Sequence, residues 1–359
     1  MNDPSQKSND IDEFKQKIDP LFSIYDVKKQ DGKIIFFGIP KKEIKAIYQE
    51  LWVIFAEKGY QFSAKYELGE YMLTASQFKP VKEKLWINVA LVVATFLTTM
   101  FMGSFLFGAD PISKPIDALK GIPFTIAIMT VLGAHETGHY LVAKKHGMHT
   151  SLPYFIPFPF GIGTMGAVIK HRGPIPNRKA LFDVGVSGPL IGLFASIIVT
   201  IIGLLLPPIA QSPDGFEIQL GIPLLFEFIT RLIPVEVSAM HPVAFAGWVG
   251  MLVTALNLIP AGQLDGGHVL RAMLGEKSAY ISNALPFLLI TLGFYVSFFL
   301  GKEGFIWVFW GLLLSLFAAS GHPKPLNDEV PLGKGRIVLG VITFLLGLLC
   351  VTLVPFQIP

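Results

Sequence analysis

The stretch Ile122-PFTIAIMTVLGAHETGHYL-Val142 places the pattern His135-Glu136-Thr137-Gly138-His139 inside a long apolar run. The run is close to the roughly 20 residues that a helix needs to cross a bilayer core of about 30 Å. On a helix the two imidazoles project from one face, one turn apart, and can share a cation. Glu136 lies about 100° round the axis, where it can take a proton from a metal-bound water. The alternative is a helix interface lined by three polar groups, but ionisable residues inside membrane helices are costly and rare.

The composition identifies a membrane protein with a restricted choice of metal ligands. Of 359 residues, 52% are hydrophobic and 15% are charged, and the mean hydropathy is +0.56. These values are outside the range of soluble domains. The single cysteine, Cys350, excludes an internal disulfide and a Cys-based zinc ribbon, so a metal site must use His, Asp or Glu. A net charge of +3 without an arginine-rich tract argues against nucleic acid as a partner.

Apolar runs predict a polytopic all-α membrane domain over residues 85–359, with about seven transmembrane helices. A stretch rich in Pro, Phe and Gly, Ser151–Ile169, has no helical pattern and predicts a membrane-embedded β-hairpin. Leu220–Ile233 is short and carries two charges, which is typical of an interfacial helix. The predicted spans are Leu85–Phe107, Ile122–Val142, Leu181–Leu206, Val243–Ile259, Ala279–Leu300, Phe305–Ser320 and Ile337–Val354.

The first 84 residues hold almost half of all charged side chains and predict a separate soluble domain. Residues 1–20 are polar and predict a disordered tail that is neither a secretory signal nor a transit peptide. Within residues 21–84, β-prone runs flank Asp31-Gly32 and Leu68-Gly69, and Lys41–Lys58 has helical periodicity. The pattern indicates a small cytoplasmic α+β module with the order ββαββ.

The distribution of Lys and Arg predicts the orientation in the membrane. The loop between the second and third spans holds six basic residues and no acid between Glu136 and Asp183, so it should be cytoplasmic. The alternation then puts the N-terminus inside and the C-terminus outside, with 25 of the 29 Lys and Arg residues on the cytoplasmic side. The predicted location is the cytoplasmic membrane of a cell.

A third metal ligand is expected because catalytic zinc usually has three protein ligands and a water. Asp265 follows the fourth span in the stretch Asn257-LIPAGQL-Asp265-GGH. The predicted topology brings the ends of the second and fourth spans to the same side of the membrane, so Asp265 reaches the depth of His135 and His139. Pro and Gly residues around it should break the helix and turn the carboxylate inward. The alternative is that Asp265 only caps the helix Gly266–Leu274.

These motifs resemble the site-2 protease family of intramembrane zinc metalloproteases, peptidase family M50. The resemblance covers residues 120–275 and is closest to the prokaryotic and plastid-type branch with a soluble N-terminal domain. It rests on the histidine motif, on Asn257-x-x-Pro260 with Leu264-Asp265-Gly266, and on three further stretches. These are Gly163-TMGAV-Ile169, Pro176-NRKALF-Asp183 and Ser187-Gly188-Pro189.

The resemblance implies that His135, His139 and Asp265 bind Zn²⁺ and that Glu136 is the general base. It also implies that Asn257 holds substrate backbone, although a helix-packing hydrogen bond is an equal alternative. Many members have an Asn three residues after the Gly-Pro of the third span, where this chain has Gly192. An exposed strand edge near Gly161, Gly163 and Thr164 could bind an extended substrate, the alternative being a buried hairpin that covers the site.

The predicted function is therefore hydrolysis of peptide bonds in or near transmembrane segments of single-span membrane proteins within the lipid bilayer. The alternatives are a membrane metal transporter or regulator that uses the same ligands, and a pseudoprotease that binds membrane helices. No residue indicates an oligomeric state. No functional role is expected for four further polar residues. His146, His149 and His171 lie in the basic loop and are expected to be solvated, and Asp183 is expected to pair with Arg178 or Lys179.

Overall fold

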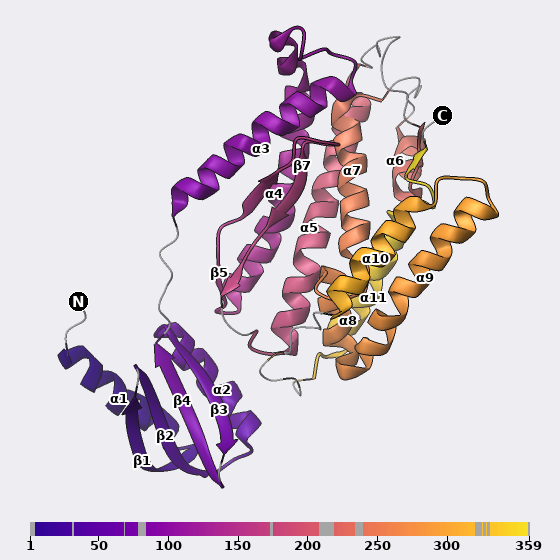
Figure 1. Cartoon of the computed structure of the whole chain (residues 1–359). Coiled ribbons are helices and arrows are strands. Elements are labelled where there is room, and N and C mark those ends of the chain that lie inside the picture. Colours follow the sequence, from indigo (N-terminus) through magenta and orange to yellow (C-terminus); the bar gives the residue numbers. More distant parts are fainter. Residues whose placement is uncertain are drawn as a thin grey trace.

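A computed structural model describes residues 4–30, 32–67, 69–77, 84–172, 175–207, 219–233, 240–319, 325, 328 and 331–357. The N-terminal part contains α1 (Pro4–Ile18), β1 (Phe22–Gln30), β2 (Lys33–Pro40), α2 (Ile44–Glu57), β3 (Tyr60–Glu67) and β4 (Glu70–Gln77). Its four strands form one antiparallel sheet in the order β1-β2-β4-β3 (Figure 1). The ββαββ order predicted from the sequence is confirmed, although Asp31 and Leu68 lie outside the described residues.

The predicted disordered tail is wrong over residues 4–18, which form helix α1. Two apolar residues one helical turn apart, Phe14 and Ile18, are fully buried against the sheet and α2. The Phe14 ring stacks on Phe55 with centroids 4.1 Å apart. These two side chains anchor the otherwise polar helix to the core of the domain, because each contributes a large apolar area.

The membrane domain is mostly helical, with four short strands between α4 and α5, one between α5 and α6, and one after α11 (Figure 1). Its helices are α3 (Leu85–Leu106), η1 (Pro115–Gly121), α4 (Ile122–Lys145), α5 (Arg178–Leu205), α6 (Leu224–Leu232), α7 (Pro242–Asn257), α8 (Asp265–Leu274), η2 (Gly275–Lys277), α9 (Ser278–Phe298), α10 (Phe305–Ala319) and α11 (Lys334–Leu349). Its strands are β5 (His149–Thr150), β6 (Tyr154–Pro157), β7 (Thr164–Val168), β8 (His171–Arg172), β9 (Gln219–Leu220) and β10 (Phe356–Gln357).

Each of the seven predicted spans overlaps a helix, but only four helical segments in the described part are long and apolar enough to cross a membrane. They are Leu85–Leu106, Pro115–Lys145, Arg178–Leu205 and Asp265–Phe298. Two shorter apolar helices cover Pro242–Asn257 and Phe305–Phe317. α7 stops after 16 residues because Pro260 and Gly262, which has φ +56°, follow in a tight turn. α11 also has 16 residues, and its first turn carries Lys334 and Arg336.

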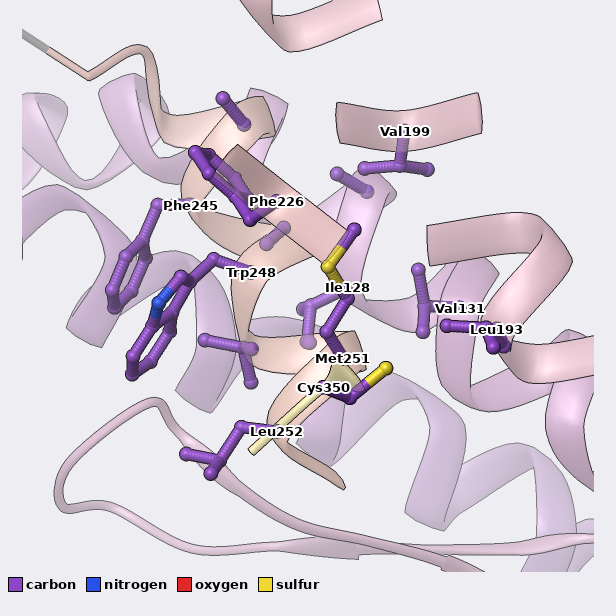
Figure 2. Close-up of a cluster of buried hydrophobic side chains, with 14 of the residues drawn as sticks. Ile128, Val131, Leu193, Val199, Phe226, Phe245, Trp248, Met251, Leu252 and Cys350 are labelled. Carbon is purple, nitrogen blue, oxygen red and sulfur yellow. The ribbon is translucent and has the colours of Figure 1, made fainter. Parts of the chain in front are cut away.

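The core of this domain lies between α4, α5, α7 and α6. Phe226, Phe245 and Trp248 are buried on one side of the cluster and Ile128, Val131 and Leu193 on the other (Figure 2). Small residues let the backbones approach closely. A Cβ at Gly203 would lie 2.1 Å from the backbone N of Ala244, and a Cβ at Gly250 would lie 2.2 Å from Ser196 Oγ. Helices α5 and α7 therefore pack closely against each other at these two points.

The predicted hairpin is present as the antiparallel pair β6 and β7, and it is attached to α3. The side-chain amide of Asn88 donates to the carbonyl of Pro153 at 3.0 Å, just before β6. The Thr98 hydroxyl donates to the carbonyl of Gly163 at 2.7 Å, just before β7. α3 therefore holds the hairpin at two points.

One end of the helix bundle is held by ion pairs between distant segments. Asp183 in α5 accepts hydrogen bonds from Arg336 in α11 at 2.7 and 2.9 Å and contacts His146 Nε2 at 2.9 Å. The predicted pairing of Asp183 with Arg178 or Lys179 is therefore wrong, and so is the prediction of a solvated His146. Arg178 instead donates to the carbonyl of Ala272, one of the last carbonyls of α8, at 2.6 and 2.9 Å, where a cation is favoured by the helix dipole.

At the other end, the C-terminal strand is joined to the segment that follows α5. β10 pairs with β9, and the Trp248 indole donates to the carbonyl of Gly221 at 2.9 Å. The last part of the chain therefore lies at the same end of the bundle as α6 (Figure 1). This relative arrangement agrees with a topology in which the loop after the third span and the C-terminus share one side.

Candidate metal centre

Three side chains from two helices converge in a small buried cluster. His135 and His139 lie on α4 and Asp265 begins α8. The two histidines are 5% and 6% exposed, so the cluster is shielded from bulk solvent. One possible ligand atom from each residue lies within 4.8 Å of the others. The structure thus brings together the two motifs that the sequence analysis predicted to share a site.

The distances within the cluster fit a tetrahedral ion. His135 Nε2 and His139 Nε2 are 3.1 Å apart, and Asp265 Oδ2 lies 3.2 Å from the first and 3.3 Å from the second. Zinc bonds to nitrogen and oxygen are about 2.0–2.2 Å, so neighbouring donor atoms of a tetrahedron lie about 3.3 Å apart. Two imidazoles and one carboxylate are a normal catalytic zinc set that leaves a fourth position free. The residues present could therefore hold a zinc ion.

The orientation of His139 is set by α5. His139 Nδ1 lies 2.8 Å from the carbonyl oxygen of Val184, so Nδ1 carries the proton and Nε2 presents its lone pair to the cluster. Pro189 has no N–H and therefore removes the helical hydrogen bond to the carbonyl of Gly185, the residue after Val184. A hydrogen bond of this kind also raises the basicity of a histidine ligand.

Glycines of α5 provide the space for both imidazoles. A Cβ at Gly188 would lie 2.0 Å from His139 Nε2, and a Cβ at Gly192 would lie 2.9 Å from His135 Nδ1. Gly192 occupies the position where many family members have Asn. In this chain the His135 ring occupies the space that a side chain at position 192 would need, which gives a steric reason for the glycine.

Substitution of Gly188 by Ala is expected to remove the bound metal, since the added methyl group would overlap the His139 ring. We expect metal affinity to fall at least about 100-fold, the upper range for loss of a supporting contact around a metal site. The measurement is metal content of the detergent-purified variant. Gly133→Ala is the matched control, because a Cβ there would meet Phe155 at 3.7 Å, an ordinary contact. Full metal content in Gly188→Ala would contradict the observed packing.

A tight turn between α7 and α8 places Asp265. The backbone N–H of Ala261 donates to the carbonyl of Ile259 at 2.7 Å, and Ser282 of α9 donates to the carbonyl of Pro260 at 3.1 Å. A Cβ at Gly266 would lie 2.2 Å from the carbonyl oxygen of Leu258, so the start of α8 presses directly on this turn. Asp265 is the first residue of α8, and Leu264 is its N-cap. The alternative role of Asp265 as the N-cap is therefore wrong.

Two further polar groups face the cluster. Glu136 is 7% exposed, and its carboxylate interacts with the backbone N–H of Ile169, which directly follows β7. Asn257, the last residue of α7, has Nδ2 3.5 Å from His135 Nε2. Asn257 thus lies beside one of the possible ligands, and Glu136, the residue after His135, lies outside the group of three.

The hairpin residues predicted to bind substrate make internal contacts. A Cβ at Gly163 (φ +85°) would lie 2.4 Å from Thr99 Cα, so this glycine packs on α3. The buried Thr164 hydroxyl donates to the carbonyl of Ile156 at 2.9 Å and accepts from the N–H of Gly166 at 3.0 Å. Gly161 (φ +59°) forms the turn and has open space where a side chain would be. The contacts of Gly163 and Thr164 therefore stabilise the hairpin itself. Substrate binding by these residues stays a prediction.

His241, which directly precedes Pro242, is the N-cap of α7. Its Nδ1 accepts a hydrogen bond from the N–H of Val243 at 3.1 Å. Burial lowers the pKa of its imidazole, which favours the neutral form that can accept this bond.

Comparison with known proteins identifies a peptidase family. Residues 123–298 match the model of peptidase family M50. The probable zinc metalloprotease EGY1 of Oryza sativa subsp. japonica is 30% identical over 249 residues, covering 66% of this chain and 41% of that protein. The probable zinc metalloprotease EGY2 of Arabidopsis thaliana is 30% identical over 254 residues, covering 67% and 43%. This chain thus spans less than half the length of these relatives.

Among solved structures, the site-2 protease from Methanocaldococcus jannaschii aligns with 63% of this chain and 87% of its own, with 19% identity and a TM-score of 0.33. The matched family range contains both histidines, Glu136, Asn257 and Asp265. None of these matches supports a metal transporter. The chain carries a domain of peptidase family M50, the site-2 protease family.

Proposed function

We propose that this chain is an intramembrane zinc metallopeptidase that hydrolyses peptide bonds in or near transmembrane segments of membrane proteins. The observation that carries the proposal is the triangle of donor atoms from His135, His139 and Asp265, with edges of 3.1–3.3 Å. The family match and the printed names of the relatives, which describe zinc metalloproteases, support the same metal and reaction.

Each residue of the site has a separate task in this reaction. When bound, zinc supplies a Lewis acid that polarises the scissile carbonyl and lowers the pKa of water to about 7. Glu136 is one residue from His135 and does not belong to the donor triangle, so its carboxylate is free to accept the proton from water and return it to the leaving amine. Asn257 can donate from Nδ2 to a carbonyl of the substrate beside His135.

The substrate is expected to bind as an extended strand, because the amides of an intact helix are hydrogen-bonded and out of reach. Ser151 and Lys170 form a hydrogen-bonded backbone contact, with the Ser151 N–H donating to the Lys170 carbonyl at 3.0 Å. Alternation along an antiparallel strand therefore turns the backbone groups of Ile169 and His171 to the free edge. The Ile169 N–H on this edge contacts the carboxylate of Glu136. A substrate that adds as a further strand would lie across the reacting groups.

The proposed setting is the cytoplasmic membrane, with a cytoplasmic domain over residues 21–84 and a multi-pass domain over residues 85–359. Seven crossings would place the N-terminus inside and the C-terminus outside, and single-span proteins are the proposed substrates. The pairing of β10 with β9 supports a shared side for the C-terminus and the loop after α5. The membrane position of the β6–β7 hairpin is part of the same proposal.

Metal removal tests the proposed chemistry. The detergent-purified full chain should contain about one zinc per molecule, and it should cleave an unfolded protein such as casein or a library of single-span membrane peptides. Treatment with 1,10-phenanthroline should abolish cleavage, and added Zn²⁺ should restore it. Metal content is measured by plasma mass spectrometry and cleavage by mass spectrometry of the products. Absence of zinc from the untreated protein, or cleavage that persists without zinc, would refute the proposal.

A further inference from the structure

His171 has a position beside the metal centre that the proposed reaction does not yet use. It belongs to β8, which continues the course of β7 after Ile169, and its partner on β5 is Thr150. Since the neighbouring pair of Ser151 and Lys170 is hydrogen-bonded, the Thr150 and His171 pair is a non-hydrogen-bonded one. The backbone of His171 therefore faces the same free edge as that of Ile169.

The imidazole of His171 lies near the centre but is not one of its ligands. It is close enough to His139 and Asp265 for electrostatic interaction with both. Within the described residues it is outside the group of side chains whose donor atoms could hold one ion. The side chain is also exposed, so a bound molecule can reach it. The imidazole therefore lies near the three possible ligands without being one of them.

The chemistry of the side chain suits a peptide group. A neutral imidazole has one donor and one acceptor nitrogen. No hydrogen bond from its ring to a described residue is present. An accessible imidazole without such a bond can donate to a carbonyl oxygen or accept from an amide of an added strand.

We infer that His171 is a substrate-positioning residue, whose ring hydrogen-bonds a peptide group of the strand bound along the β7–β8 edge next to the metal. The inference rests on the proposed function and specifies how its peptide is held. Because the ring and the backbone of one residue would both contact the substrate, His171 would align the scissile bond with the centre. His171 would therefore strengthen the binding of extended peptides but not the binding of small molecules that contact only the metal.

The test compares two zinc-binding probes on the purified full chain. One is a peptidyl hydroxamate with several apolar residues, and the other is acetohydroxamate, which has no peptide backbone. His171→Phe should reduce the affinity for the peptidyl probe about 10-fold or more, as expected for loss of a hydrogen bond. Its affinity for acetohydroxamate and its zinc content should not change. His171→Gln keeps a donor and an acceptor and should recover most of the affinity. His149→Phe, on the neighbouring strand β5, is the matched control.

The outcomes separate this inference from the proposed function. Equal affinity of His171→Phe and the unchanged protein for the peptidyl probe would overturn the inference and leave the peptidase proposal intact. Equal weakening of both probes would show a disturbed metal centre and would also overturn it. An unchanged protein without zinc would refute the proposed function and the inference together. Selective loss with rescue by Gln is the supporting result, because a purely structural role would not distinguish the probes.

Discussion

Asp265→Ala is expected to strip the protein of zinc. Asp265 Oδ2 lies 3.2 and 3.3 Å from the two histidine nitrogens, and without it the centre retains two protein ligands. Losing a direct ligand should reduce affinity by more than the roughly 10- to 100-fold found for outer contacts. Zinc is measured per chain after purification in detergent. Asp110→Ala, in the exposed segment before η1, provides a control that should keep about one zinc per chain.

This substitution also tests whether two sequence-distant motifs make one site. Asp265 starts α8, whereas the histidines lie on α4. Zinc content that ignores Asp265→Ala would mean that the ion uses another third ligand, and the proposed centre would be wrong. Because Asp265 is the first residue of α8 and does not cap it, the substitution should leave the helix in place.

Glu136→Gln is expected to produce the opposite combination, with full zinc content and almost no hydrolysis. Gln has nearly the same shape but cannot accept the proton from water, and general acid–base catalysis contributes about 10²- to 10⁴-fold to rate. Zinc content and product formation are measured on the same preparation. Glu136 lies outside the donor triangle, so the metal should remain. Loss of zinc in this variant would place Glu136 among the ligands, and undiminished cleavage would remove it from the mechanism.

Much of the helical architecture could be predicted from the sequence because apolar runs and helix breakers are local signals. Each of the seven predicted spans overlaps a helix, although α11 ends at Leu349, before the predicted end at Val354, and Pro260 with Gly262 ends the α7 segment as expected. Crossing the bilayer also depends on the length of a helix and on charges near its ends. Helices α7 and α11 have 16 residues each and are therefore not among the four segments long enough to cross a membrane. Helix α1 was missed because two buried side chains, Phe14 and Ile18, order an otherwise polar segment.

The residues of the centre could be predicted because few residue types bind zinc and their spacing on a helix is fixed. The supporting contacts could not, since they depend on packing between helices. The space that Gly188 leaves for His139 and the carbonyl of Val184 that receives its Nδ1 proton have no local signature. The partner of Asp183 was also unpredictable, because Arg336 lies 153 positions away and closer arginines were available.

The origin of the site in distant parts of the chain has a consequence for biosynthesis. Asn257 follows His135 by 122 positions, and Asp265 comes later still. Contacts of such long range form late in folding because a large loop must close first. The ribosome must therefore release α8 before zinc can be captured with full affinity. A nascent chain with only α3 to α5 in the membrane would hold both histidines and Glu136 but lack Asp265, so the proposed centre stays incomplete until α8 has been made.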